Sequence, residues 1–131
     1  MQYSATIYLG QLDLVESSAG ATAKLMIYSG SAPANCAAAD TGTLLATLTL
    51  PSDWMNAASG TTKTKLGTWS GTASAGAGAT PTHFRLKDNA GTTCHVQGTS
   101  GVGSGEVNLD GTITSGQTIT INSFTLNAAN T

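Results

Sequence analysis

The stretch that decides the fold is residues 81–98, PTHFRLKDNAGTTCHVQG, which reads as two short strands joined by a turn. Apolar and polar residues alternate on both arms, as they do in strands that bury one face. Phe84 and Leu86 define the buried face of the first arm, and Cys94 and Val96 define that of the second. We therefore predict an antiparallel hairpin with its apolar residues turned toward a core.

The turn between the two arms sets their register. A two-residue loop would place apolar residues opposite polar ones, whereas a three-residue loop, Asn89 to Gly91, places Leu86 opposite Cys94. A loop of this kind ends in a left-handed residue, a conformation that glycine adopts without a steric penalty. The sequence therefore predicts a left-handed Gly91.

Similar alternation predicts most of the other strands. They are expected at Ala23–Tyr28, Leu44–Leu50, Thr61–Trp69, Glu106–Asp110 and Thr118–Leu126. The last of these changes phase midway, so a single bulge at Asn122–Ser123 is needed to keep its apolar residues on one face. With about eight strands and no convincing long helix, the prediction is an all-β fold, an antiparallel β-sandwich of jelly-roll or Greek-key type, over residues 1–131 as a single domain.

The N-terminal segment is the least regular part of the pattern. Met1–Leu9 alternates like a short strand or an extended arm, while Gly10–Ala21 fits neither the strand nor the helix period. Residues 1–20 are therefore a candidate N-terminal arm. Either the arm pairs within its own sheet, or it crosses to a neighbouring subunit with Tyr3, Ile7 and Tyr8 as partner-binding residues, because buried aromatic side chains carry much interface energy.

Composition excludes several classes of function. The net charge is −2 and only 9% of residues are charged, which argues against nucleic-acid binding, since that needs a basic patch. No run of about 18 apolar residues predicts a membrane span, and Met1–Tyr3 does not resemble a secretory signal. We expect the chain to stay in the cytoplasm in which it is made or to leave it within a larger particle. In that compartment Cys36 and Cys94 are predicted to be reduced.

No group of residues predicts catalysis or a cofactor. His83, Cys94 and His95 are the nearest approach to a metal site, but Cys94 is expected to point to the opposite face of the hairpin. The glycine-rich stretch 99–105 lacks the Lys-Ser/Thr of a phosphate-binding loop, and no serine lies in a nucleophile elbow. Trp54 and Trp69 could form a sugar-binding surface, although burial is favoured. We therefore expect a protein that is not an enzyme and that needs no cofactor or metal.

Two stretches together resemble a known family. They are AKLMIYSGSAPANCAAADTGTLLATLTL, residues 23–50, and FRLKDNAGTTCHVQGTSGVGSGEVNLDGTITSGQTITINSFTL, residues 84–126. Their order and turns resemble the head decoration, or cement, proteins of tailed bacteriophages, which are small jelly-roll virion proteins. Members of that family often carry a longer helical N-terminal segment, which here only Gly10–Ala19 would supply.

The resemblance implies a structural role in the virion. A decoration protein binds the outer surface of the capsid and clamps neighbouring subunits of the major capsid protein, often as a dimer or trimer. The implied partners are therefore the major capsid protein and further copies of the chain, with no nucleic acid and no membrane. The alternative is a tail or fibre module that binds host glycans.

Overall fold

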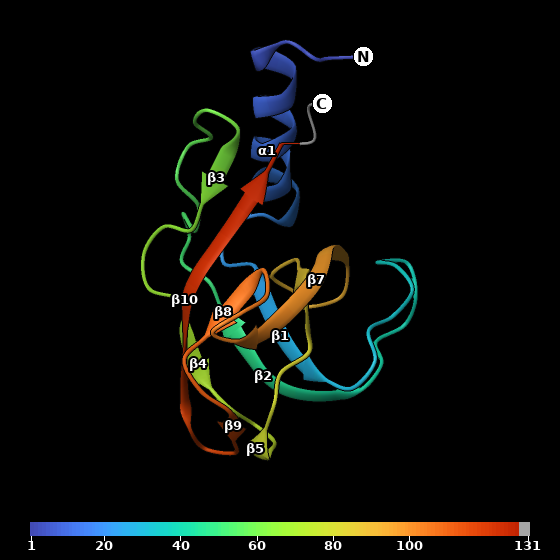
Figure 1. The fold of residues 1–131 in the computed structure, drawn as a ribbon, viewed down its shortest axis with the longest axis vertical. Coiled ribbons are helices and arrows are strands. Elements are labelled where there is room, and N and C mark those ends of the chain that lie inside the picture. Colours follow the sequence, from blue (N-terminus) through green and yellow to red (C-terminus); the bar gives the residue numbers. More distant parts are fainter. Residues whose placement is uncertain (129–131) are drawn as a thin grey trace.

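The computed structural model describes residues 1–128 and shows one helix and ten strands (Figure 1). The elements are α1 (Ala5–Ala19), β1 (Lys24–Ser29), β2 (Thr43–Thr49), β3 (Thr62–Thr64), β4 (Ser70–Thr72), β5 (Ala77–Ala79), β6 (His83–Lys87), β7 (Cys94–Val102), β8 (Val107–Leu109), β9 (Ile113–Thr114) and β10 (Thr118–Asn127). The predicted all-β, sandwich-like architecture is confirmed, with an N-terminal helix added to it.

Eight strands form one sheet that folds back on itself. Its order is β2-β1-β6-β7-β8-β10-β3, and β4 also pairs with β10. β7 and β8 run parallel, and the other pairs of this sheet are antiparallel. β2 and the segment after β4 meet at a bridge between Ala46 and Ala73. A side chain on Gly71 would come within 3.1 Å of Leu48, so glycine permits this close approach. β5 and β9 form a separate two-stranded sheet.

Aromatic rings fill the core at the end of the body nearest α1. Trp69 lies between Trp54 and Phe124, with ring centroids 5.9 Å and 5.4 Å away, and Phe84 packs edge-on against Phe124. Both tryptophans are 0% exposed, which confirms the predicted burial. Their indole N–H groups donate to the carbonyls of Gly20 and Leu66, so neither buried polar atom is left unpaired.

The central hairpin forms with its predicted glycine but in a different register. Gly91 has φ of 72°, which confirms the left-handed turn. Leu86, however, faces Val96, and Lys87 faces Cys94, so the prediction that Leu86 lies opposite Cys94 is wrong. The turn is wider than predicted because the Asp88 carboxylate accepts the backbone N–H groups of Thr92 and Thr93. A register shift in the adjoining ladder then turns Cys94 away from the core.

The predicted bulge in the last strand is confirmed. Along β10 and β8, Ile121 faces Leu109 whereas Ser123 faces Asn108, which leaves Asn122 as the additional residue. The bulge returns Phe124 to the same buried side as Ile121.

The N-terminal segment is a helix, so the predicted strand or extended arm at Met1–Leu9 is wrong. The short alternation seen in residues 5–9 belongs to a longer helical pattern, in which Val15 and Ala19 turn toward the core cluster and Leu12 is also buried. The helix begins after Ser4 and is capped by Gly20, whose N–H donates to the carbonyl of Glu16 at 2.9 Å and whose positive φ, 83°, takes the chain out of the helix. Among residues 1–128, no helix has the length and apolar character of a membrane-spanning segment.

Candidate interaction surface

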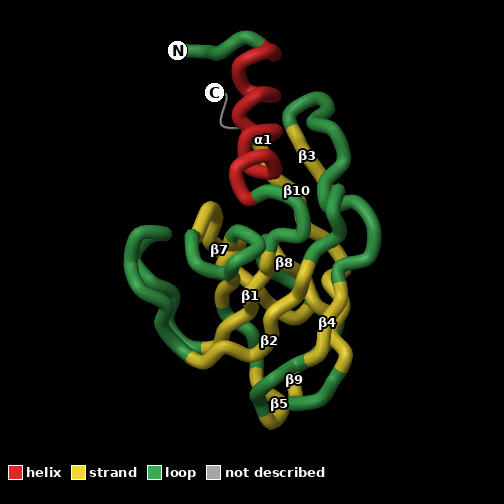
Figure 2. The backbone as a smooth tube through the Cα atoms, turned by 180° about the vertical axis from the view of Figure 1, so that it is seen from behind, coloured by secondary structure: helices red, strands yellow, loops and turns green. Residues whose placement is uncertain are grey.

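The three predicted partner-binding residues lie in or just before the first turns of α1. Figures 1 and 2 show this end of the helix standing clear of the β body, with the N-terminus at its outer tip. Tyr3 is 44% exposed and Ile7 is 49% exposed, while Tyr8 is half-buried. The structure therefore places Ile7 and Tyr8 on a helix and not on a strand, with Tyr3 just before its first turn.

Most of the exposed large apolar side chains of residues 1–128 belong to this segment. There are six in the described part of the chain, and four of them are Met1, Tyr3, Ile7 and Leu14. No side chain between Met1 and Leu12 carries a charge. We call residues 1–14 the N-terminal projection. Asp13 is the one charged side chain of this projection, and it pairs with Lys63. A segment with so little charge and several exposed apolar side chains is typical of a surface that meets another protein.

Leu14 extends the surface beyond the predicted residues. It is 61% exposed and lies two helical turns from Ile7, so both side chains follow the same face of α1. Beside Leu14, a groove of about 210 Å³ runs between α1 and His95 of β7, with Gln11 and Ser18 also on its wall. The seven-residue spacing of Ile7 and Leu14 was the signal in the sequence, and the strand interpretation of residues 1–9 concealed it.

An ion-pair cluster fastens the helix to the β body. The buried ammonium group of Lys63, in β3, lies 2.7 Å from Asp13 and 3.2 Å from Glu16. Burial by itself lowers the pKa of Lys63, but hydrogen bonds to the two carboxylates and their charges outweigh it and raise this pKa. Glu16 also accepts the backbone N–H of Met55 at 2.9 Å. The helix is therefore anchored from Asp13 onward. Leu14 stays exposed beside the anchor, and the residues before Asp13 project.

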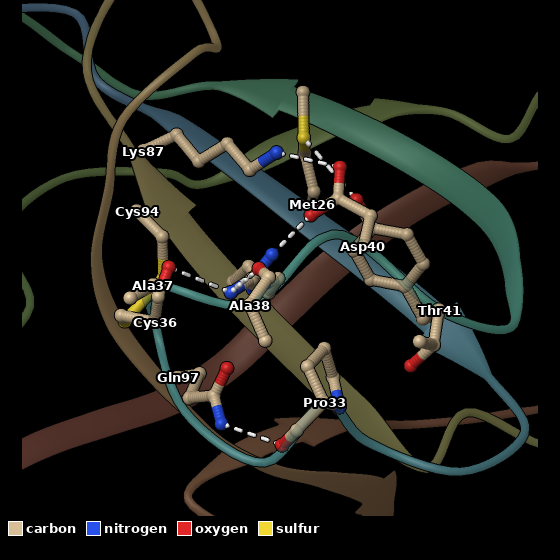
Figure 3. A network of polar contacts seen from close by, with 12 residues as sticks. Met26, Pro33, Cys36, Ala37, Ala38, Asp40, Thr41, Lys87, Cys94 and Gln97 are labelled. Carbon is tan, nitrogen blue, oxygen red and sulfur yellow. Dashed lines mark hydrogen bonds and ion pairs between the residues drawn. A yellow bond between two sulfur atoms is a disulfide. The ribbon is translucent and has the colours of Figure 1, made fainter.

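A second feature is the long loop between β1 and β2, residues 30–42, which we call the strap. It covers the polar face of β6 (Figure 3). One guanidinium nitrogen of Arg85 donates at 3.0 Å to each of the carbonyls of Asn35, Cys36 and Ala38. The second terminal nitrogen of the guanidinium contacts Asp40, whose other oxygen lies 2.7 Å from Lys87. The alternation of β6 predicts a strand that buries only one face, and this prediction is wrong, because Arg85 on the other face is 2% exposed.

Cys36 of the strap and Cys94 of β7 form a disulfide, so the prediction of two reduced thiols is wrong. The residues lie 58 positions apart in the sequence, and their pairing depends on the path of the strap. Gln97 adds a further contact from β7, donating to the carbonyl of Pro33 at 2.9 Å. Figure 3 shows both connections on the same side of the strap.

The charges under the strap shift the pKa values of their neighbours. Burial raises the pKa of Asp40, but hydrogen bonds from Lys87 and Arg85 outweigh it, so the net pKa of Asp40 is lowered. Burial, reinforced by the charge of Asp40, raises the pKa of Tyr28 to about 12. Burial also lowers the pKa of His83, which stacks on Tyr28 with ring centroids 5.0 Å apart. These groups hold the strap in place.

The structure separates the three residues considered for a metal site. His83 lies under the strap, Cys94 is in the disulfide, and His95 borders the groove beside α1. Within residues 1–128, no group of three or more histidine, cysteine and acidic side chains could hold a metal ion.

Comparisons with protein families, with curated proteins and with solved structures found no match to this chain.

Proposed function

We propose that this chain is a structural virion protein that decorates the outer surface of a phage capsid. In this proposal it clamps neighbouring subunits of the major capsid protein and associates with further copies of itself on the shell. The observation that carries the proposal is the N-terminal projection, which presents uncharged, exposed apolar side chains beyond a tightly packed β body. The resemblance of residues 23–50 and 84–126 to decoration proteins supports it from the sequence.

The shape of the molecule suits a clamp. The β body is fastened internally by the aromatic core, the strap and the disulfide. The projection stands on this rigid base because Lys63 anchors the second half of α1. A rigid base limits the conformational entropy lost on binding, so more of the contact energy contributes to the affinity for the capsid. Burying a half-exposed Ile or Leu side chain is worth about 1 kcal/mol, a modest gain that many copies on one shell would multiply.

The burial of both tryptophans favours this proposal over the glycan-binding alternative. Sugar-binding surfaces commonly use exposed aromatic rings, whose flat apolar faces pack against the sugar. Trp54 and Trp69 instead lie in the core, 0% exposed. Tyr3 and Tyr8 remain at the surface, but on a narrow helical projection.

The test measures binding of the purified chain to expanded shells of the parent phage that lack it. A double substitution, Ile7→Gln with Leu14→Gln, keeps good helix-forming residues and removes the exposed apolar pair. We expect it to weaken binding by about 30-fold and to leave the melting temperature of the isolated protein unchanged.

The matched control is Val102→Gln, which changes a 40% exposed apolar residue at the end of β7, away from the projection. It should bind as the unsubstituted chain does. If the unsubstituted chain does not bind shells, or is found in virions only as a few copies at the tail, the capsid proposal is wrong. A glycan array would then examine the tail-module alternative.

A further inference from the structure

The contacts beneath the strap fall into two groups that differ in chemistry. One is ionic and polar, centred on Arg85 and Asp40, and the other is the covalent bond between Cys36 and Cys94. We propose that the strap closes in two stages: the ionic contacts dock it on the sheet while the thiols are still reduced, and the disulfide then locks it when the chain leaves a reducing compartment. This inference does not rest on the proposed function.

The first stage is built into the conformation of the strap. The side-chain oxygen of Asn35 accepts the backbone N–H groups of Ala37 and Ala38 at 2.9 Å and 3.0 Å, which forms a local turn around Cys36. In this turn the carbonyls of Asn35, Cys36 and Ala38 converge on Arg85. Hydrogen bonds from a charged donor are stronger than those between neutral groups. None of these contacts needs the disulfide.

Docking also places the two sulfur atoms for reaction. The carbonyl of Cys36 itself accepts a hydrogen bond from Arg85, so the contacts of Arg85 hold the reacting residue directly. The Cα atoms of Cys36 and Cys94 lie 5.2 Å apart, within the range that a disulfide needs. Gln97 holds the preceding part of the strap against the same strand, at Pro33. Docking by the ionic contacts therefore holds the two thiols close together, although they lie 58 residues apart in the sequence.

The surroundings of the sulfur atoms favour oxidation by a soluble disulfide. A cavity of about 380 Å³ opens on both cysteines, and Arg85 and Lys87 lie on its wall. These two cations exceed the single charge of Asp40, and positive charge favours the reactive thiolate form. With glutathione disulfide as oxidant, the Cys36 and Cys94 thiols lose two electrons and two protons. These reduce one glutathione disulfide to two glutathione thiols, by way of a mixed disulfide.

The experiment follows hydrogen exchange in residues 30–42 of the purified chain, before and after reduction. In the reduced chain, exchange should remain within about threefold of the oxidised chain, since the charged hydrogen bonds persist. Cys36→Ser, which cannot form the disulfide, should behave like the reduced chain. If either form exchanges as fast as an unfolded peptide, the disulfide alone holds the strap and the proposal is wrong.

A substitution of Asp40, which pairs with Arg85 and Lys87, tests the link between the two stages. Asp40→Asn should accelerate hydrogen exchange in the strap about tenfold in the reduced chain and slow disulfide formation by glutathione disulfide by a similar factor. In the oxidised chain, the substitution should leave the exchange rate of the strap unchanged. Asp110→Asn, at an exposed position outside the strap, is the matched control and should match the unsubstituted chain in every measurement. An Asp40→Asn chain that oxidises at the unsubstituted rate would overturn the proposal.

Discussion

Reduction of the Cys36–Cys94 disulfide should lower the stability of the whole domain. The bond closes a loop of 58 residues, and the chain-entropy relation for a loop of this size corresponds to about 4 kcal/mol of stabilisation at 25 °C. The effect arises mainly in the unfolded chain, because Arg85 and Gln97 keep their contacts with the strap after reduction. For a domain of this length, the melting temperature should fall by about 15 °C.

Thermal unfolding followed by circular dichroism, with and without a reducing agent, measures this difference. Intact mass after alkylation confirms the state of both cysteines before each scan. Cys36→Ser should melt close to the reduced protein, and the reducing agent should have no effect on it. A difference below about 4 °C between verified oxidised and reduced protein, which corresponds to about 1 kcal/mol, would refute the reasoning.

Three further predictions concern the helix anchor, alkaline pH and the central turn. Lys63→Met should destabilise the fold by about 1 kcal/mol and reduce the helical signal in circular dichroism, because it leaves the acidic groups of α1 without their cation. The control, Lys65→Met at a half-buried position, should lower the stability and the helical signal less. Tyr28 has a folded-state pKa of about 12, above its unfolded value, so its contribution to stability is complete below about pH 10 and is lost as the pH rises toward 12. Absorbance titration should show one late-ionising tyrosine, and Tyr28→Phe should abolish it; an unchanged titration would contradict the assignment. In urea unfolding, Gly91→Ala should lower the free energy of unfolding by about 1 kcal/mol, because residue 91 has a left-handed backbone. Gly111→Ala, where a side chain would meet open space, should lower it less. Equal losses of unfolding free energy would argue against the left-handed turn at Gly91.

Local patterns in the sequence determined much of the β body. Phe84 and Leu86 alternate with polar residues and are buried, and Gly91 adopts the left-handed turn. The change of phase between Ile121 and Phe124 located a bulge that the structure contains. These predictions succeed because a strand has a period of two residues and only glycine enters left-handed turns without strain, and both properties are local.

The N-terminal segment shows where local patterns become ambiguous. Residues 5–9 are compatible with a strand, and only the packing of Val15 and Ala19 against the core, together with the burial of Leu12, selects the helix. Lys63 stabilises the helix further by pairing with Asp13 and Glu16, although it lies 47 residues or more away along the chain. The sequence thus determined that Tyr3, Ile7 and Tyr8 form an uncharged, apolar segment, and tertiary packing decided that a helix presents it together with Leu14.

The strap is the feature that only the tertiary structure decided. Alternation along β6 correctly separates its two faces, but it cannot reveal that a loop from another part of the chain covers the polar one. Once residues 30–42 lie there, Arg85 and Lys87 become buried and find their partners in Asp40 and the strap carbonyls. The same path brings Cys36 to Cys94, which the shifted register has turned toward it. A disulfide depends on the distance between two residues in space, and a single sequence with two cysteines contains no measure of that distance.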